Sequence, residues 1–350
     1  MLIRKRKLTQ NQSRQIAQNN EQVDDSLLHT GVIVSHFGKQ LLVQLTALAS
    51  TPSNTDTTPE HPTPTLAPKL GDIVRCHTRT NLPMMTVGDT VKISYTANDE
   101  FGRIEKLGDR TTLITRPDRY HKVKPVAANV DLLVVVFAPL PKPATSLIDR
   151  YLLIAHLSQV PVLLVLNKAD LIDADTQKIY DEYQALGINM VMTSITNPDS
   201  LATLTQHLTG KLAIFAGQSG VGKSSIINHL LPDAEQSTNM ISEISKLGQH
   251  TTTTSRLLAY DPFDLGKGGV IDTPGIREYG VWHLSKDTIL GAFSELASYN
   301  GDCAFRDCTH AQNAKGCALW QAVEKGEVLA RRVESLLELQ AEAGSVAGKK

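Results

Sequence analysis

The segment from Gly217 to Ser225, GQSGVGKSS, has the residue types and spacing of a loop that cradles nucleotide phosphates. Its glycines let backbone N–H groups turn inward around the phosphates at the start of a helix. In such a loop we expect Lys223 to reach the β- and γ-phosphates and the Ser224 hydroxyl to bind Mg²⁺. The residues predicted to line the phosphates are Gly217, Gln218, Ser219, Gly220, Val221, Gly222, Lys223, Ser224 and Ser225.

A second stretch, NKAD, could select the base. Asp170 can accept both N–H donors on the guanine edge, Asn167 can reach the base from the other side, and the stem of Lys168 can lie along the ring. The alternative is an ordinary strand end followed by a helix cap. The next strand end, Thr193-Ser194-Ile195, lies where a backbone N–H would contact guanine O6, and Ser194 is the residue predicted to make that contact. Two consecutive strand ends that both fit favour base recognition.

Two further segments could sense the γ-phosphate. Asp272 ends an apolar strand in the stretch DTPG, where a carboxylate can hold Mg²⁺ through water and the N–H of Gly275 can face the phosphate. In the polar stretch GQHTTTTS, one threonine, Thr251 or Thr252, can complete the Mg²⁺ shell.

These motifs occur in the order base recognition, phosphate loop, first switch, second switch, whereas the phosphate loop usually comes first. Each part of a GTP site is present once. The sequence therefore predicts a circularly permuted GTPase domain in which the chain leaves the domain just after the second switch.

Water activation needs a group that DTPG does not supply, because Gly275 is followed by Ile276, which has no hydrogen-bonding side chain. Intrinsic hydrolysis is therefore expected to be slow. His250, beside the threonine run, is the nearest candidate to position water, and it joins Lys223 and Asp272 as a predicted catalytic residue. The alternative is that His250 contacts RNA or shapes its loop.

Three of the four cysteines fall close together, in the pattern Cys303-x4-Cys308-x-His310-x6-Cys317. Three thiolates and one imidazole suit a closed tetrahedral site for one structural Zn²⁺. The alternative is a set of scattered buried cysteines. The following residues, 318–343, predict one helix with an apolar face of Val328, Leu329, Val333, Leu336 and Leu337.

The bulk composition is that of a soluble globular protein, since 41% of the 350 residues are hydrophobic and 20% are charged. No apolar run approaches the roughly 18 residues needed to span a bilayer, so no membrane contact is expected. The basic N-terminus lacks the apolar segment of a secretory signal, so a cytoplasmic protein is expected.

The first part of the chain has the positive charge expected of a segment that binds a polyanion. Residues 1–27 are predicted to be a disordered basic arm, which on its own could equally be a solvated tail. Short alternating strands over residues 28–112 predict an OB- or SH3-like barrel, interrupted by a Pro- and Thr-rich mobile loop at 50–68. Residues 69–124 carry 11 Lys and Arg against 7 Asp and Glu. Cys76, on one of these strands, is expected to be a buried apolar residue.

Residues 113–284 have a different hydrophobic pattern, in which near-continuous apolar strands alternate with amphipathic helices. The strands are expected at 130–138, 161–167, 189–194 and 211–217, and this alternation predicts a parallel sheet covered on both faces. Ligands of such sheets bind at the carboxyl ends of the strands, where both nucleotide motifs stand. Residues 285–350 would form the zinc-binding domain with its C-terminal helix.

Together, NKAD, GQSGVGKSS, GQHTTT, DTPGIREYG and the Cys-Cys-His-Cys cluster resemble the circularly permuted GTPases of small-subunit ribosome biogenesis, the RsgA or YjeQ family. The resemblance covers roughly residues 28–340 and implies an OB-fold barrel, a permuted GTPase domain and a zinc domain. One departure is the interval from His310 to Cys317, which is one residue longer than the family pattern.

The resemblance also implies a function: binding of GTP or GDP with Mg²⁺, docking of a monomer on the 30S subunit and its rRNA alongside assembly factors, and hydrolysis stimulated by that subunit. Two alternatives remain open, a non-ribosomal P-loop GTPase and an rRNA-binding scaffold in which the nucleotide is structural.

Overall fold

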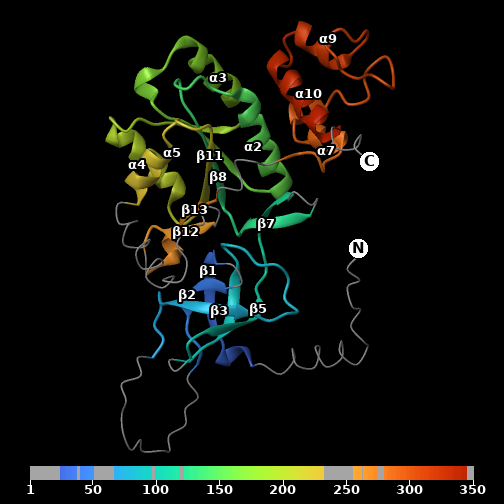
Figure 1. The fold of residues 1–350 in the computed structure, drawn as a ribbon. Coiled ribbons are helices and arrows are strands. Elements are labelled where there is room, and N and C mark those ends of the chain that lie inside the picture. The colour runs from blue at the N-terminus through green and yellow to red at the C-terminus, as the bar shows by residue number, and fades with distance from the viewer. Residues whose placement is uncertain are drawn as a thin grey trace, which may run out of the picture.

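A β-barrel, an α/β sheet and a helical C-terminal region follow one another along the chain (Figure 1). The computed structural model describes residues 24–37, 40–50, 67–96, 99–117, 122–231, 255–261, 263–273 and 280–344. The predicted basic arm and the predicted mobile loop fall almost entirely outside the described residues. Within the described ranges, no helix has the length and apolar character needed to cross a membrane.

The barrel closes through five strands in the order β1-β2-β3-β5-β4-β1, with β3 and β5 parallel and the other pairs antiparallel. Every second side chain points inward and is buried, which is why alternating polar and apolar residues predict these strands. The predicted OB-type barrel is confirmed. Its strands are β1 (His29–Phe37), β2 (Gln40–Ala47), β3 (Ile73–Thr78), β4 (Thr90–Ser94) and β5 (Gly102–Leu107).

Cys76 belongs to the core of this barrel, as predicted. Its side chain is fully buried, and burial raises the pKa of the thiol to about 12. Gly102 on the neighbouring strand makes room for it, because a Cβ there would lie 2.9 Å from the Cys76 sulfur.

The α/β region is a six-stranded sheet in the order β10-β9-β8-β11-β13-β12, parallel except for β12. The predicted parallel sheet is confirmed. Its strands are β8 (Leu132–Phe137), β9 (Val162–Leu166), β10 (Asn189–Met192), β11 (Leu212–Gly217), β12 (Arg256–Ala259) and β13 (Gly269–Asp272).

Helices cover both faces of this sheet (Figure 1). Along β8, residues 133, 135 and 137 belong to the core shared with α2 and α3, while residues 132, 134 and 136 belong to the core shared with α4 and α5. This double burial explains the continuous apolar run of β8. The helices are α2 (Thr145–Ser158), α3 (Ala174–Ala185), α4 (Pro198–Leu208) and α5 (Lys223–Leu230).

A hairpin that the sequence analysis did not predict, β6 (Leu113–Pro117) with β7 (Val123–Ala128), links the barrel to the sheet. The Thr86 hydroxyl donates to the carbonyl of Val126 at 2.8 Å, and the N–H of Ala128 donates to Val87 at 2.9 Å. A second link is the antiparallel pairing of β1 with β12 at Ser35 and Arg256. The predicted domain boundaries at 112/113 and 284/285 stay predictions.

The C-terminal region packs beside α2 through the helices α7 (Lys286–Gly291), α8 (Ser294–Ala297), α9 (Ala318–Glu324) and α10 (Ala330–Gly344) (Figure 1). The prediction of one helix over residues 318–343 was wrong, because the chain turns between α9 and α10. At that turn Gly326 has a φ of +74°, and the N–H of Glu327 donates to Ala322 at 2.9 Å. This arrangement ends a helix even where the apolar period continues.

Buried charges join this region to the sheet domain. Arg332 on α10 donates to Asp149 on α2 at 2.5 Å and to Glu295 at 2.6 Å, with the Arg332 side chain only 4% exposed. Tyr183 on α3 also donates to Asp149, at 2.6 Å. At the preceding position, Arg331 pairs with Glu182 at 2.6 Å and lies over the Tyr183 ring. The C-terminal helix is therefore docked by charge as well as by apolar packing.

Candidate guanine-nucleotide and zinc sites

The two nucleotide motifs meet at one edge of the sheet. NKAD follows β9, the phosphate loop follows β11, and both strands flank β8. Since β8, β9, β11 and β13 are parallel, the segments after them come together at the carboxyl ends of the strands. The order of strands in the sheet thus unites segments that occur in reversed order in the sequence.

Two glycines of the phosphate loop are required by close backbone contacts. Gly217 has a φ of +135°, and a Cβ there would lie 2.1 Å from the carbonyl oxygen of Val136. Gly222 has a φ of +96°, and its Cβ would lie 2.3 Å from the side-chain nitrogen of Asn167. The loop can therefore adopt this path only with glycine at both positions.

Lys223 begins α5 and extends back across the loop. Its Nζ donates to the carbonyls of Gly217 at 2.9 Å and Gln218 at 2.6 Å, and the residue is 9% exposed. Ser224 and Ser225 in the same first turn are exposed. A buried ammonium at the start of a helix, with free hydroxyls beside it, can bind phosphate oxygens and a hydrated cation.

Asn167 ties the base motif to the phosphate loop. Its Nδ2 donates to the carbonyl of Val221 at 2.9 Å, while its Oδ1 accepts from the Thr193 hydroxyl at 3.1 Å. Both side chains are buried. Thr193 belongs to the strand end at which the sequence analysis expected a base contact, but its hydrogen bond to Asn167 was not predicted.

Lys168 holds a third segment against the site. It has a φ of +56°, and its Nζ donates to the carbonyls of Leu140 at 2.7 Å and Gly220 at 2.8 Å. Pro141 lies next to Gly220, 3.5 Å from where a Cβ would be. The loop after β8 was also missed. The carboxyl-end rule could have indicated it, because β8 lies between the two motif-bearing strands.

Asp170 is oriented by Ser194, whose hydroxyl donates a short hydrogen bond to the carboxylate. The N–H of Ser194 donates to the Ser200 hydroxyl at 3.0 Å. Ser194 therefore orients the Asp170 carboxylate that would accept hydrogen bonds from guanine. The predicted contact between the Ser194 backbone and the base stays a prediction. A carboxylate held in this way can accept two N–H bonds from a guanine edge.

Asp272 ends β13, directly beside β11, and its side chain is exposed. Asp272 and Ser224 therefore offer oxygen ligands from neighbouring elements, which is the donor chemistry that Mg²⁺ prefers. The remaining predicted residues, His250, Thr251, Thr252 and Gly275, lie outside the described residues.

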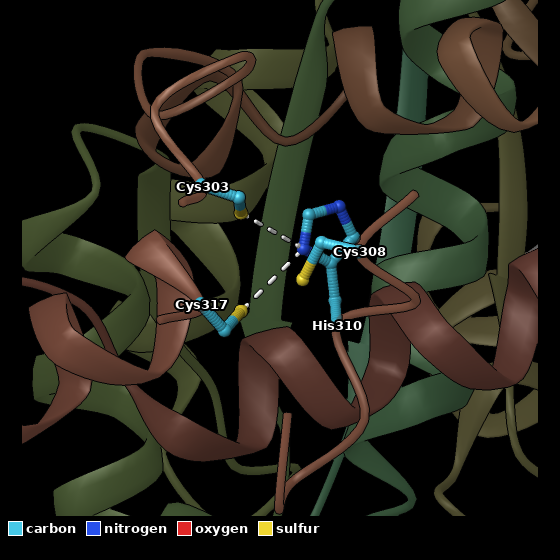
Figure 2. A group of neighbouring side chains, drawn as sticks. All are labelled: Cys303, Cys308, His310 and Cys317. Atoms are coloured by element: carbon cyan, nitrogen blue, oxygen red, sulfur yellow. Dashed lines mark hydrogen bonds between the residues drawn. The ribbon is translucent and has the colours of Figure 1, made fainter. Parts of the chain in front are cut away.

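The four predicted zinc ligands converge (Figure 2). Their ligand atoms all lie within 4.8 Å of one another, and Nδ1 of His310 is 3.6 Å from the Cys303 sulfur and 3.5 Å from the Cys317 sulfur. This spacing is compatible with four bonds of about 2.0 to 2.3 Å to one central Zn²⁺. The longer interval before Cys317 does not prevent convergence.

Burial shifts the pKa values of two residues of the cluster. Burial raises the pKa of the Cys317 thiol to about 11, so its thiolate needs a positive charge nearby. Burial, with a smaller effect of Lys286, lowers the pKa of His310 and favours the neutral imidazole that binds metal. The indole N–H of Trp320 donates to the His310 carbonyl at 2.8 Å and fixes that loop.

Comparison with known proteins agrees with this geometry. The family model described as RsgA GTPase matches residues 107–282. The chain is 41% identical over 314 residues to the small ribosomal subunit biogenesis GTPase RsgA of Alcanivorax borkumensis, covering 88% of this chain and 83% of the relative. The chain belongs to the RsgA GTPase family. Its similarity to the Proteus mirabilis RsgA, at 36% identity, extends over 95% of this chain and 94% of that one.

Solved structures with the same architecture include YloQ, described as a circularly permuted GTPase, with a TM-score of 0.61 and 26% identity over 91% of this chain and 96% of that chain. YjeQ from Thermotoga maritima matches with a TM-score of 0.62 and 28% identity, over 93% and 100% of the two chains. The permuted order predicted from NKAD and the phosphate loop is thus a property of the RsgA fold.

Guanine selection by Asp170 gives the first prediction. Asp170→Asn should weaken GTP binding by roughly ten- to a hundred-fold, because an amide presents a donor where the carboxylate accepts two bonds. The same variant should gain preference for xanthine nucleotides. Titration with fluorescent GDP and XDP measures both, with Asp175→Asn, an exposed carboxylate on α3, as the matched control. Equal binding of ATP and GTP by the unmodified protein would contradict the assignment.

The zinc cluster gives the second prediction. Purified protein should contain one Zn²⁺ per chain, and Cys308→Ala should lose it and loosen the C-terminal region, since zinc supplies much of the folding energy of small sites. Elemental analysis measures the metal. Trp320 donates to the His310 carbonyl in that region and Trp282 lies just before α7, so tryptophan fluorescence reports its unfolding. Cys76→Ala should keep the metal. Unmodified protein without zinc would show that the cluster is not a zinc site.

Proposed function

We propose that this protein hydrolyses GTP on the 30S ribosomal subunit late in its maturation, binding the subunit in the GTP state and leaving after hydrolysis. The observation that carries the proposal is the joining of Asn167 to the phosphate loop at Val221, since it makes one guanine-nucleotide pocket from two motifs. The names of the RsgA relatives supply the small subunit as the partner.

The barrel supports a role on RNA. OB-type barrels commonly bind oligonucleotides on the face formed by their second and third strands. Here β1 of the barrel pairs with β12 of the nucleotide-binding sheet, and β12 pairs in turn with β13, which carries Asp272. We propose that the barrel contacts rRNA, and that the protein acts as a cytoplasmic monomer alongside other assembly factors.

The residues at the phosphates are proposed to have separate binding roles. Lys223 would neutralise the β- and γ-phosphates, Ser224 would bind Mg²⁺ directly, and Asp272 would hold it through water, with Thr251 or Thr252 closing the shell. Bound Mg²⁺ supplies charge stabilisation as the γ-phosphoryl group is transferred. Asp170 and Ser194 would fix the base, so that the γ-phosphate is held in one position.

Water positioning is assigned to His250, because the residue after Gly275 is Ile276 and cannot orient water. The imidazole can accept or donate a hydrogen bond near neutral pH. Slow turnover by the protein alone is the corresponding expectation. A partner can also supply such a group, as it does in other GTPases.

The third prediction concerns the nucleotide state that binds 30S particles and the role of His250 in hydrolysis. With a non-hydrolysable GTP analogue the protein should sediment with 30S particles, and with GDP it should not. His250→Ala should keep its GTP affinity and lose the stimulation of turnover by 30S particles. His207→Ala, an exposed histidine on α4, is the matched control and should be stimulated normally.

Other outcomes separate the alternatives. Absence of 30S association in either nucleotide state would support a non-ribosomal GTPase. Association without turnover would support an rRNA-binding scaffold with a structural nucleotide. Normal stimulation of His250→Ala would remove His250 from the mechanism and indicate a group supplied by the ribosome.

A further inference from the structure

Two hydroxyl groups join the segments that were predicted to sense the γ-phosphate. Ser255 is the last residue of the stretch GQHTTTTS, and Thr273 is the second residue of DTPG. The Ser255 hydroxyl donates to the Thr273 hydroxyl at 2.9 Å. Thr273 is 5% exposed and Ser255 is half-buried. Each predicted switch segment therefore contributes one residue to this hydroxyl pair.

The hydroxyl pair closes the open end of the hairpin formed by β12 and β13. The two strands pair antiparallel in a register that ends with Arg256 opposite Asp272. One step further along this register Ser255 lies opposite Thr273, so the two side chains continue the ladder beyond the last backbone pair. Because Thr273 directly follows Asp272 in the chain, the hydroxyl pair restrains the backbone next to this acid.

The other edge of β12 is held by the barrel. The sheet order places β12 between β13 and β1 of the barrel (Figure 1). Ser35 on β1 pairs with Arg256, the residue that directly follows Ser255. In the connection between β12 and β13, Phe263 lies against Gly71, where a Cβ would be 3.3 Å from the Cα of Phe263. The barrel therefore supports β12 at both ends, and the hydroxyl pair ties the end of β13 to this supported strand.

The Asp272 side chain depends on the position of its own backbone. Its carboxylate is exposed, and none of the residues that the structure describes donates a hydrogen bond to it. Asp170, the acid of the base motif, is by contrast held by the Ser194 hydroxyl. Mg²⁺ demands near-ideal octahedral geometry, so a carboxylate that holds it through water must be placed accurately. Contacts at the end of β13 are the means by which this chain can place Asp272.

We propose that Ser255 and Thr273 are positioning residues, whose hydroxyl pair holds the end of β13 so that Asp272 faces the Mg²⁺ of bound GTP. The inference rests on the proposed function only for the role of Asp272 toward Mg²⁺, and it takes nothing from the ribosomal role. The end of the predicted first switch thereby supports the acid of the predicted second switch.

A purely structural role of the hydroxyl pair would have a different signature. Pairs of Ser and Thr hydroxyls stabilise antiparallel strands wherever they occur. Removal of such a contact would lower the unfolding temperature and leave the requirement for Mg²⁺ as it is. Removal of a positioning contact raises the Mg²⁺ concentration that nucleotide binding requires, while the affinity for nucleotide in the absence of Mg²⁺ stays the same.

The test measures binding of a fluorescent, non-hydrolysable GTP analogue to the full-length protein as Mg²⁺ is titrated, and again in EDTA. Thr273→Val keeps the side-chain shape but removes the hydroxyl, and it should raise the half-saturating Mg²⁺ concentration roughly three- to ten-fold, as expected for one lost hydrogen bond. Thr273→Ser retains the hydroxyl and should restore the low requirement. The matched control is Thr205→Val on α4, which removes a hydroxyl bonded to the Leu201 carbonyl at 2.9 Å and should change nothing.

A double variant separates the hydroxyl pair from any other contact of Thr273. Ser255→Ala should give the same shift as Thr273→Val, and the two changes together should shift the requirement no further, because both remove one contact. Amide hydrogen exchange of the protein without nucleotide or metal gives a second readout, in which β12 and β13 should exchange faster in both single variants than in Thr205→Val. Additive shifts, or exchange equal to that of Thr205→Val, would overturn the proposal.

Asp272→Asn distinguishes failure of this inference from failure of the function on which it rests. The variant should raise the Mg²⁺ requirement at least as far as Thr273→Val does. If Asp272→Asn raises it and Thr273→Val does not, Asp272 keeps its proposed role and the hydroxyl pair loses the role assigned to it. If neither variant raises it, the proposed role of Asp272 fails and this inference fails with it. None of these measurements uses 30S particles, so the ribosomal role is tested separately.

Discussion

The hydrogen bond from the Asn167 side chain to the carbonyl of Val221 sets the distance between the two halves of the nucleotide pocket. It is possible because Gly222 has no Cβ, which would otherwise lie 2.3 Å from the amide nitrogen. The two motifs emerge from strands that flank β8, so the sheet determines their separation and the order along the chain does not. A circular permutation therefore leaves the pocket intact and changes only where the chain enters and leaves.

The point at which the permuted chain leaves the GTPase domain, after β13, explains how the C-terminal region is attached. Beyond β13 the described chain resumes at residue 280, and the N–H of Val281 donates to Glu342 on α10 at 3.0 Å. Burial would raise the pKa of Glu342, but bonds from Arg150 on α2 and from Val281 lower it, so the carboxylate is charged. The buried pair of Arg332 and Asp149 adds a second fixed point. Because an unpaired buried charge is costly, these pairs select one docking geometry for the C-terminal region.

The sequence predicted those features that a local pattern encodes. Continuous apolar runs indicated the buried parallel strands, alternation indicated the barrel, and fixed spacing indicated both nucleotide motifs and the cluster of three cysteines and one histidine. The hairpin at residues 113–128 depends on distant hydrogen bonds to Thr86 and Val87, which no local pattern records. The turn at Gly326 between α9 and α10 was not predicted, because the apolar residues keep a helical spacing on both sides of it. Leu140 contributes to the site through its carbonyl alone, so its side chain gave no signal.

The central claim is that the two motifs form one guanine-nucleotide pocket through the close contact at Gly222. The most direct measurement is the affinity for fluorescent GDP of Gly222→Ala compared with Gly187→Ala. Both glycines have positive φ, at +96° and +78°, but a Cβ at Gly187 meets nothing within 4 Å. Backbone strain is therefore matched and only the contact differs. We expect Gly222→Ala to lose roughly ten-fold or more in affinity and Gly187→Ala to bind normally. Equal affinity of the two variants would contradict the account.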